Sequence, residues 1–510
     1  MSDLADLVAR SLGEETRERF ESRLGDQTAF LRSELADDAL DNDQFAVGLE
    51  MEAYALDGDA DEPRLLRLPA SVFEASDAIA KELGLHNTEL NTDPSVFDAE
   101  GLAEQAATIR EDTAEARAAL DEVDAELVLD AMWTTPPAEG SVAYLSATEA
   151  RGGLDVAANM RQAPRYVAID EAIREHAGGS LELSVPGAEL SFPSIVFESL
   201  ATSIQPHLQI PSTEAFPAYF NAGIRTLGPL LALSTNSPFL PGDCYDAVED
   251  SEGLVEETHH ELRIAVFEQS VNYTPNPKVR VPGDIDSVED VIARVGGDDL
   301  VAPFLQEWVE DDEGAYTDNY WEFEHKRGTY WRWLRCVVGG DPVGTGDERS
   351  VRIEYRPLPT QPTVTDVVGL QALTVGLLRG LVAEDHPLAE LSWDAAERCF
   401  YDVAAEGLDA DLAWVTEDGE RTSDPETVFG EVFEYAERGL AVQGVDSDEA
   451  AAYLDPIRAR WAAETAPSDW KKAGVRERIE DGMDLEDAIS EMQSEYVRLA
   501  HESESFAEWL

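Results

Sequence analysis

Alternating polar and apolar residues in three short segments constrain the fold of this chain more than any other feature of its sequence. The first segment is FAVGLEMEAYAL, residues 45–56. Successive side chains of a strand point to opposite faces, so Glu50 and Glu52 would lie side by side on one face, opposite apolar residues. In an acidic chain an isolated pair of this kind more often marks an amphipathic strand whose polar face lies in water. The pair therefore needs partners from elsewhere in the sequence before it indicates a site.

Two further segments show the same alternation and supply such partners. They are SIQPHLQI, residues 203–210, and VRIEYRPL, residues 351–358. The residues that share a polar face are Gln205, His207 and Gln209 in the first, and Arg352, Glu354 and Arg356 in the second. Pro206 cannot donate a hydrogen bond to a neighbouring strand, so we expect an edge position or a bulge at that point.

If the three polar faces meet in one concave sheet, they form an oxygen-rich cluster with one imidazole. Its members would be Glu50, Glu52, His207 and Glu354. This donor set suits Mg²⁺ or Mn²⁺ rather than a thiolate-bound metal. Cations between the carboxylates would also relieve their mutual repulsion. Arg356, two residues after Glu354, would then point toward the anion that the metal holds.

A fourth segment, KELGLHNTELNTDP at residues 81–94, adds two more acids to this set, Glu82 and Glu89. Residues 87–92 are typical of a short strand, which favours a role for Glu89. Gly84 weakens the case for a regular element near Glu82. Two surface acids are the alternative interpretation, above all for Glu82.

The order of these patterns predicts a mixed α+β protein. Residues 1–40 form a charged amphipathic pattern and are expected to be an N-terminal helical cap. Residues 41–385 mix short alternating segments with helices and are expected to be the catalytic body, and residues 386–510 are helical almost throughout. Three cysteines, far apart and without a C-x-x-C pair, fit neither disulfides nor a zinc site and are expected to be buried.

The charge of the chain excludes two classes of partner. It carries 106 acidic and 37 basic residues, a net charge of −69. Nucleic acids and anionic membranes are bound through Lys and Arg, so we expect neither as a partner. Only five of the basic residues are lysine, and this composition is typical of a halophile-type protein from a salt-saturated cytoplasm, where salt screens the charge. The first residues do not form a signal sequence, and no stretch of eighteen apolar residues occurs, so we expect a cytoplasmic protein that acts on small molecules.

The segments resemble one enzyme family, glutamate-cysteine ligase type 2 and related carboxylate-amine ligases, which are distant relatives of glutamine synthetase. The resemblance rests on GLEMEAYAL, on QPHLQI, on LLALSTNSPFLPGD at 230–243, on RIEYRPLPTQPT at 352–363 and on AERCFYDVAAEGLDADLAW at 396–414. Their order and spacing extend over residues 44–500. The stretch 249–320 is acidic and matches poorly, so catalysis is better supported than the identity of the acceptor.

The resemblance implies a glutamine synthetase-like antiparallel half-barrel sheet flanked by helices, with ATP as cosubstrate and Mg²⁺ (or Mn²⁺) as cofactor. It implies two ligand sets for the metal ions. Glu52, Glu82 and Glu89 would hold one ion, and Glu50, His207 and Glu354 another. Such ligases transfer the γ-phosphoryl group of ATP to a carboxylate, and an amine then displaces phosphate from the acyl phosphate.

An arginine is expected to stabilise the charge that develops on the transferring phosphoryl group. Arg356 is the first choice, and Arg332 and Arg335 in TYWRWLR are the second. Cation–π packing on Trp331 and Trp333 is an equal alternative for Arg332 and Arg335. The remaining residues expected to bind substrate are Gln205, Gln209, Asn236, Arg161 and Arg165; for at least one of the last two, a structural ion pair is the more common role.

The sequence thus predicts an ATP- and Mg²⁺-dependent carboxylate-amine ligase, with glutamate and cysteine as the leading substrate pair by resemblance. One alternative keeps the fold and joins an amino acid to a different amine. Others are a metal-dependent phosphotransferase or hydrolase and a non-catalytic binding protein.

The glycine-rich residues 339–350 contain no Walker motif. A hairpin connection is expected there, and a cover over the nucleotide is the alternative. The sequence leaves a homo-oligomer open.

Overall fold

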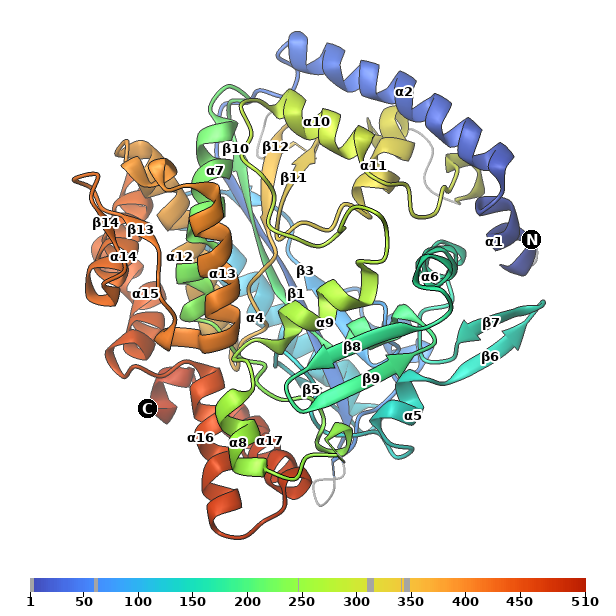
Figure 1. Ribbon diagram of the computed structural model, residues 1–510. Helices are drawn as coiled ribbons and strands as arrows, with labels where there is room; N and C mark the ends of the chain where they lie inside the picture. Colours follow the sequence, from blue (N-terminus) through green and yellow to red (C-terminus); the bar gives the residue numbers. More distant parts are fainter. Residues whose placement is uncertain (1–3, 59–62, 246, 310–315, 341, 344–348) are drawn as a thin grey trace.

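The computed structural model describes residues 4–58, 63–245, 247–309, 316–340, 342–343 and 349–510. At its centre lies an eight-stranded sheet in which every paired strand is antiparallel to its neighbour. The strands are β1 (Ala46–Asp57), β2 (Ala80–Lys81), β3 (Asn87–Asn91), β4 (Ser95–Val96), β5 (Ala125–Val128), β10 (Ile204–Ile210), β11 (Leu334–Val338) and β12 (Val351–Tyr355). The main order is β11-β12-β10-β1-β3-β2, and β4 and β5 pair with β1 as well. The sheet curls into the predicted half-barrel, so the predicted α+β fold is confirmed (Figure 1).

The register of the central strands follows from their alternating pattern. Apolar residues of β1 face the buried core, and the strand pairs with β10 so that Glu50 lies opposite Gln205. In turn, β10 pairs with β12, with His207 opposite Glu354. The expected edge position at Pro206 is wrong, because β10 is an interior strand, but the alternative, a bulge, is confirmed. His207 pairs with Glu354 whereas Ser203 bridges Pro359, so residues 204–206 lie opposite four residues, 355–358. The proline is tolerated because its recorded pairing with β12 begins only at the next residue, His207.

Three small antiparallel hairpins lie outside the central sheet. They are β6 (Thr148–Arg151) with β7 (Leu154–Ala157), β8 (Leu181–Val185) with β9 (Ala188–Phe192), and β13 (Trp414–Val415) with β14 (Arg421–Thr422). The expected connection before the Glu354 strand is confirmed as a hairpin between β11 and β12. The glycine-rich cover over nucleotide that was the alternative falls partly on residues 341 and 344–348, which lie outside the described residues.

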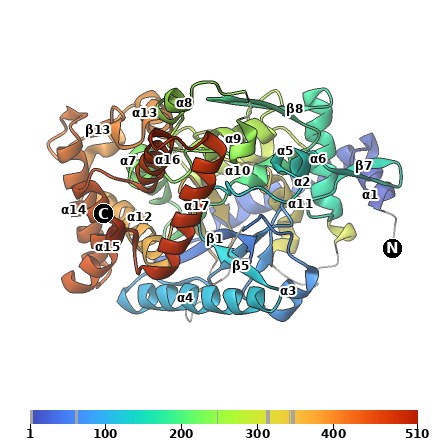
Figure 2. The same ribbon diagram turned by 90° about the horizontal axis from the view of Figure 1, so that it is seen from below.

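Helices cover both sides of the sheet and its ends. Before residue 330 they are α1 (Leu4–Ser11), α2 (Glu14–Ala36), α3 (Ala70–Ala75), α4 (Ala99–Asp121), α5 (Ser141–Leu145), α6 (Pro164–Ala177), α7 (Phe216–Ala232), α8 (Ser251–Glu257), α9 (Leu262–Val271), α10 (Val288–Gly297) and α11 (Trp321–Arg327). The N-terminal α2 packs on α10 and α11 (Figure 1), where Arg23 Nη1 lies 2.6 Å from the buried Glu322 Oε1. Seen from below, α4 runs along the sheet beside β1 and β5 (Figure 2).

The C-terminal part is helical, as predicted. Its helices are α12 (Val364–Ala383), α13 (Trp393–Glu406), α14 (Pro425–Val442), α15 (Ser447–Ala462), α16 (Pro467–Glu480) and α17 (Leu485–Glu502). Short 3₁₀ helices are η1 (Ile195–Leu200), η2 (Gly242–Cys244), η3 (Gln306–Trp308), η4 (Tyr316–Tyr320), η5 (Pro387–Glu390), η6 (Gly407–Asp409) and η7 (Phe506–Trp509). The three cysteines are buried, as expected. The division at residues 40 and 385 stays a prediction.

Helix α12 is the apolar centre of this helical part and packs against α7, α14 and α15. Among the described residues it is the one helix long and apolar enough to cross a membrane, but 83% of its most apolar window is buried inside the protein. Burial of that kind is what a core helix needs. Close packing on α14 depends on glycines: a Cβ on Gly439 would meet Gly376 O at 1.9 Å.

Candidate active site

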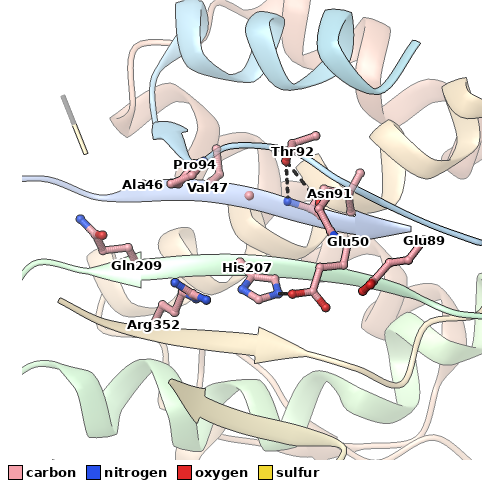
Figure 3. A pocket seen from close by; sticks show the side chains of 12 residues that line it. Ala46, Val47, Glu50, Glu89, Asn91, Thr92, Pro94, His207, Gln209 and Arg352 are labelled. Carbon is pink, nitrogen blue, oxygen red and sulfur yellow. Dashed lines mark hydrogen bonds and ion pairs between the residues drawn. The ribbon is translucent and has the colours of Figure 1, made fainter. Parts of the chain in front are cut away.

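A cavity of about 230 Å³ lies on the polar side of the sheet and brings together most of the predicted site residues. Carboxylates and guanidinium groups face each other across it. The residues with charged side chains in its wall are Glu50, Glu52, Glu82, Glu89, Glu198, Arg165, Arg335 and Arg356. A neighbouring cavity of about 270 Å³ shares Glu50 and Glu89 and adds His207, Gln209 and Arg352. Figure 3 shows the Glu50, Glu89 and His207 side chains pointing into one space.

Glu50 and His207 form a contact between neighbouring strands on this face of the sheet. His207 Nε2 lies 3.2 Å from Glu50 Oε1, because the two residues stand on paired strands two positions apart in register. The same nitrogen is buried and makes no well-aligned hydrogen bond. Burial by itself would raise the pKa of Glu50, and the imidazole outweighs it and lowers this pKa. The pair thus offers an ionised carboxylate oxygen with the imidazole held beside it.

Glu52 is fixed by hydrogen bonds from β10 and the residue before it. Ser203 donates from its backbone nitrogen at 2.7 Å and from Oγ at 3.1 Å, and Gln205 Nε2 donates to the other oxygen at 3.2 Å. Burial raises the pKa of Glu52 although these donors and Arg356 oppose the shift. Three hydrogen bonds therefore hold this carboxylate in place in the cavity wall.

Glu354 stands among arginines. Arg335 Nε and Nη2 donate to its two oxygens at 2.9 and 2.6 Å, Arg356 Nη1 donates to Oε1, and Arg327 Nη1 lies 3.6 Å from Oε2. Burial would raise the pKa of Glu354, but Arg335 and Arg356 hold it well below the usual range. Arg356 also donates to Gln205 Oε1 at 2.5 Å. Two guanidinium groups thus face the cavity at the point where Glu354 was predicted to bind metal.

The opposite part of the wall holds acids whose ionised form is disfavoured. Burial, then the neighbouring Glu52 and Glu198, raises the pKa of Glu82 to about 8. Burial, then Glu82 and Glu50, raises the pKa of Glu89 to about 9. Crowded carboxylates of this kind accept a cation readily, because a positive charge removes both the repulsion and part of the desolvation penalty.

Glu198 was missed by the sequence analysis. It lies on η1 and lines the same cavity, and burial followed by the charge of Glu52 raises its pKa to about 8. The segment SIVFESL carries no strand alternation and no repeated acid, so no pattern in the sequence distinguished this glutamate from the other acids of the chain.

Arg165 is the arginine of the wall without an acidic partner. It begins α6 one residue after Pro164, and within the described ranges no hydrogen bond or ion pair is formed by its guanidinium group. Its Nε is buried, and burial lowers its pKa. Gly328 leaves the room that this side chain fills, since a Cβ there would lie 2.3 Å from Arg165 Nη2. A buried guanidinium aimed at a cavity suits a ligand carboxylate.

Three of the predicted residues lie away from this cavity. Arg332 lines a separate cavity, where its guanidinium carbon lies 3.9 Å from the centroid of the Tyr330 ring. Asn236 is fully buried and donates to Thr360 O and Tyr496 Oη, both at 2.9 Å. Arg161 donates to Lys81 O at 2.7 Å. Gln209 does line the second cavity, but it also donates to Asn42 Oδ1 at 3.2 Å.

The donor chemistry of the site fits a hard divalent cation, which prefers carboxylate oxygens and accepts one imidazole. The spacing is not that of a closed site: in the described part of the chain, no group of three or more His, Cys, Asp or Glu side chains converges closely enough to hold a metal ion. The physical reason lies in the pairs above, since Glu354 is turned toward arginines and Glu52 toward Ser203.

One of two solved structures that are similar to this chain supports its architecture. A bifunctional glutathione synthetase from Pasteurella multocida matches with 15% identity and a TM-score of 0.51, over 93% of this chain and 55% of that one. The chain therefore spans little more than half the length of that neighbour. A glutamate–cysteine ligase from Francisella tularensis, solved in complex with AMP, matches with 12% identity and a TM-score of 0.48, over 91% and 90% of the two chains. No curated protein matches the chain.

The half-barrel sheet, whose cavity has carboxylates on one wall and arginines on the other, places the protein in the fold class of that synthetase. The particular family follows from the sequence itself. The profile of glutamate-cysteine ligase family 2 matches residues 46–502, and the chain belongs to that family.

Proposed function

We propose that the protein joins glutamate to cysteine, giving γ-glutamylcysteine, with ATP and Mg²⁺ in the cavity described above. One observation carries the proposal: a wall of five glutamates faces Arg335, Arg356 and the unpaired Arg165 within one cavity. The proposal includes a cytoplasmic, halophile-type protein, because a net charge of −69 needs molar salt for screening.

Two anions must meet in the first step, and the arginines make this approach favourable. A carboxylate oxygen of the donor acid attacks the γ-phosphorus of ATP, the bond to the bridging oxygen breaks, and ADP leaves. Arg356 and Arg335 lie where they can donate to the oxygens of the transferring group once Glu354 turns to other partners. The amine then attacks the acyl carbon, phosphate leaves and the amine nitrogen loses a proton.

The metal ions would be held by the two ligand sets that the resemblance implies. Glu52, Glu82 and Glu89 lie together in the cavity wall, and Glu50 lies 3.2 Å from His207. When bound, Mg²⁺ supplies charge neutralisation between the phosphates and the carboxylates. Glu354 would join the second ligand set once it gives up its contact with one arginine. Cation binding would then free the guanidinium group of that arginine to contact phosphate.

Arg165 is assigned to the α-carboxylate of an amino acid substrate. Its side chain is half-buried in the cavity wall with Nε buried, and within the described residues its guanidinium group forms no ion pair. Leaving it unpaired costs free energy that a substrate carboxylate would offset through a charge-assisted hydrogen bond.

The identity of the acceptor amine has less support than that of the donor acid. Beside Arg165 the wall carries Tyr166, Phe267 and Trp331, and the rings of Phe267 and Trp331 lie 6.4 Å apart. These side chains accept an apolar or a thiol-bearing amine equally well. A ligase for a different amine is therefore the second candidate, and a phosphotransferase or hydrolase that uses water remains the third.

The test is phosphate release by the full chain in molar KCl, with ATP, Mg²⁺ and glutamate and a panel of amines that includes cysteine. We expect release that requires both glutamate and cysteine, together with a product whose mass is that of the dipeptide. Release with another amine would replace the acceptor and keep the ligase. Release without any amine would overturn the ligase proposal in favour of hydrolysis.

A matched pair of variants links the activity to this cavity. Glu89→Gln removes one carboxylate of the wall, whereas Glu189→Gln changes an exposed glutamate on β9. We expect the first to lower the rate at least 100-fold and to raise the Mg²⁺ concentration needed for half-maximal rate, because one oxygen ligand loses its charge. The second should behave as the parent protein.

A further inference from the structure

A second cavity, of about 590 Å³, lies on the other side of residues 330–335 from the candidate active site. The side chains of this segment point alternately to the two spaces. Trp331 and Arg335 line the active-site cavity, whereas Tyr330 and Arg332 line the second one. The proposed reaction uses no residue of the second cavity.

Arginines dominate the lining of this second cavity. It is lined by Arg280, Arg294 and Arg332 with two acids, Asp298 and Glu397. The chain has 106 acidic and 37 basic residues, so its average surface is acidic. A cavity lined by three guanidinium groups differs from that average in charge. A local excess of positive charge within an acidic protein attracts a small anion.

The two acids only partly offset these arginines, although Glu397 interacts electrostatically with Arg280. Asp298 is already shared, because its carboxylate accepts a hydrogen bond from Arg332 Nη2 at 3.1 Å and also pairs with Lys278 Nζ. Arg332 is 2% exposed and is held further by donation to Lys278 O. One carboxylate thus compensates two buried cations.

The guanidinium groups of the other two arginines remain available to a ligand in the cavity. Arg294 donates from Nη1 to Gly283 O at 2.7 Å and from Nη2 to Asp284 O, so its guanidinium group is oriented by backbone carbonyls. Arg280 is exposed and, in the part of the chain that the structure describes, its guanidinium group makes no hydrogen bond or ion pair. Its backbone forms an isolated parallel bridge with Arg332, which holds the two residues side by side.

An apolar surface lies next to these charges. Trp393 at the start of α13 lines the cavity, and its Nε1 donates to Pro282 O at 2.7 Å, which fixes the orientation of the indole. Its ring is therefore available for contact with a flat ligand body, at no cost in rotamer freedom.

We propose that this cavity binds a small organic oxyanion, a carboxylate or a phosphate on a flat apolar body. Arg280 and Arg294 receive the oxyanion, and the Trp393 ring contacts the body. The site is separate from the proposed ligase chemistry, and its test needs no turnover.

The experiment is a titration of the full chain with phenyl phosphate and with benzoate, followed by tryptophan fluorescence and by the thermal unfolding midpoint. Ionic strength is held constant by replacing KCl. Inorganic phosphate, which lacks the flat body, reports the contribution of the oxyanion alone. The two aromatic probes distinguish a phosphate from a carboxylate ligand.

The variant Arg280→Ala removes the unpaired guanidinium group, and Arg421→Ala on β14 removes an exposed arginine far along the chain as the control. We expect saturable binding of at least one aromatic probe, weakened at least fivefold in Arg280→Ala and unchanged in Arg421→Ala, with Arg280→Lys in between. Absence of saturable binding, or equal binding by Arg280→Ala and the parent, would overturn the proposal.

Discussion

Arg335 and Glu354 form a bidentate pair across two neighbouring strands, with Nε and Nη2 of the arginine 2.9 and 2.6 Å from the two carboxylate oxygens. The residues lie directly opposite each other in the β11–β12 register. This geometry needs the planar guanidinium fork, which a lysine cannot reproduce. The pair lies where a phosphoryl group is expected. A substitution in it should therefore affect both the stability of the hairpin and the rate of the reaction in the cavity.

Arg335→Lys should lower the rate of amine-dependent phosphate release about 10- to 100-fold, because a point charge replaces two aligned donors. The unfolding free energy should fall by about 1–2 kcal/mol. Arg498→Lys, in an exposed pair with Glu502, is the control and should change neither quantity. An unchanged rate in Arg335→Lys would remove this arginine from the proposed mechanism.

Glu354→Gln tests the proposed metal ligand at the same point. The substitution leaves two guanidinium groups without their shared carboxylate, so we expect a loss of about 3–5 kcal/mol in unfolding free energy. The turnover of ATP should fall further than in Arg335→Lys. Turnover equal to that of the parent protein would show that Glu354 does not bind the metal. Circular dichroism and the ATPase assay on the same sample separate unfolding from loss of chemistry.

Arg165→Met should raise the KM for the amino acid whose α-carboxylate it binds at least 10-fold and change kcat less, because the lost contact is made before the reaction begins. The KM for ATP should stay constant. Arg174 lies on the same helix and pairs with Glu171, so Arg174→Met serves as the matched control. Equal KM values for both amino acids in Arg165→Met and the parent would contradict the assignment.

Asp170 provides a test of pH dependence outside the proposed metal ligands. Its carboxylate accepts a hydrogen bond from Ile195 N at 2.8 Å, and burial raises its pKa to about 7. Since the pKa is higher in the folded state than the usual 3.8, the unfolded state ionises first. The stability contribution is complete below pH 4 and is lost as the pH rises to about 7.

Asp170→Asn keeps an acceptor for Ile195 and removes this titration. We expect the variant to lose less stability than the parent between pH 4 and pH 7, by about 3 kcal/mol over that interval. Denaturant unfolding at several pH values measures the difference. Glu175→Gln, an exposed residue of the same helix, is the control. Parallel curves for Asp170→Asn and the parent would show that Asp170 titrates normally.

At two glycines of α14, substitution by alanine is expected to have opposite effects on the unfolding free energy. A Cβ on Gly439 would lie 1.9 Å from Gly376 O, whereas a Cβ on Gly430 meets nothing within 4 Å. Gly439→Ala should therefore lower the unfolding free energy by about 2–3 kcal/mol through overpacking. Gly430→Ala should raise it by about 0.5–1 kcal/mol through helix propensity. Thermal unfolding in molar KCl measures both, and equal signs would contradict the close packing of α12 on α14.

The sequence by itself determined the strands that carry the site, because a period of two places every second residue on the same face. Glu50 and Glu52, the face of β10 and the face of β12 were predicted in this way, and the register confirms them as neighbours. Family membership was also readable from the order of these motifs. The charge of the chain predicts a solvent of high salt and argues against polyanions as partners, and both of these stay predictions.

Tertiary structure alone decided which side chains face the cavity. Arg332 and Arg335 are equivalent in the sequence, yet only Arg335 lies in a strand that pairs with β12, while Arg332 contacts Tyr330 and Asp298 behind it. Glu198 reaches the cavity from a 3₁₀ helix. Positions of this kind depend on contacts between segments far apart in the chain, and local periodicity carries no information about them.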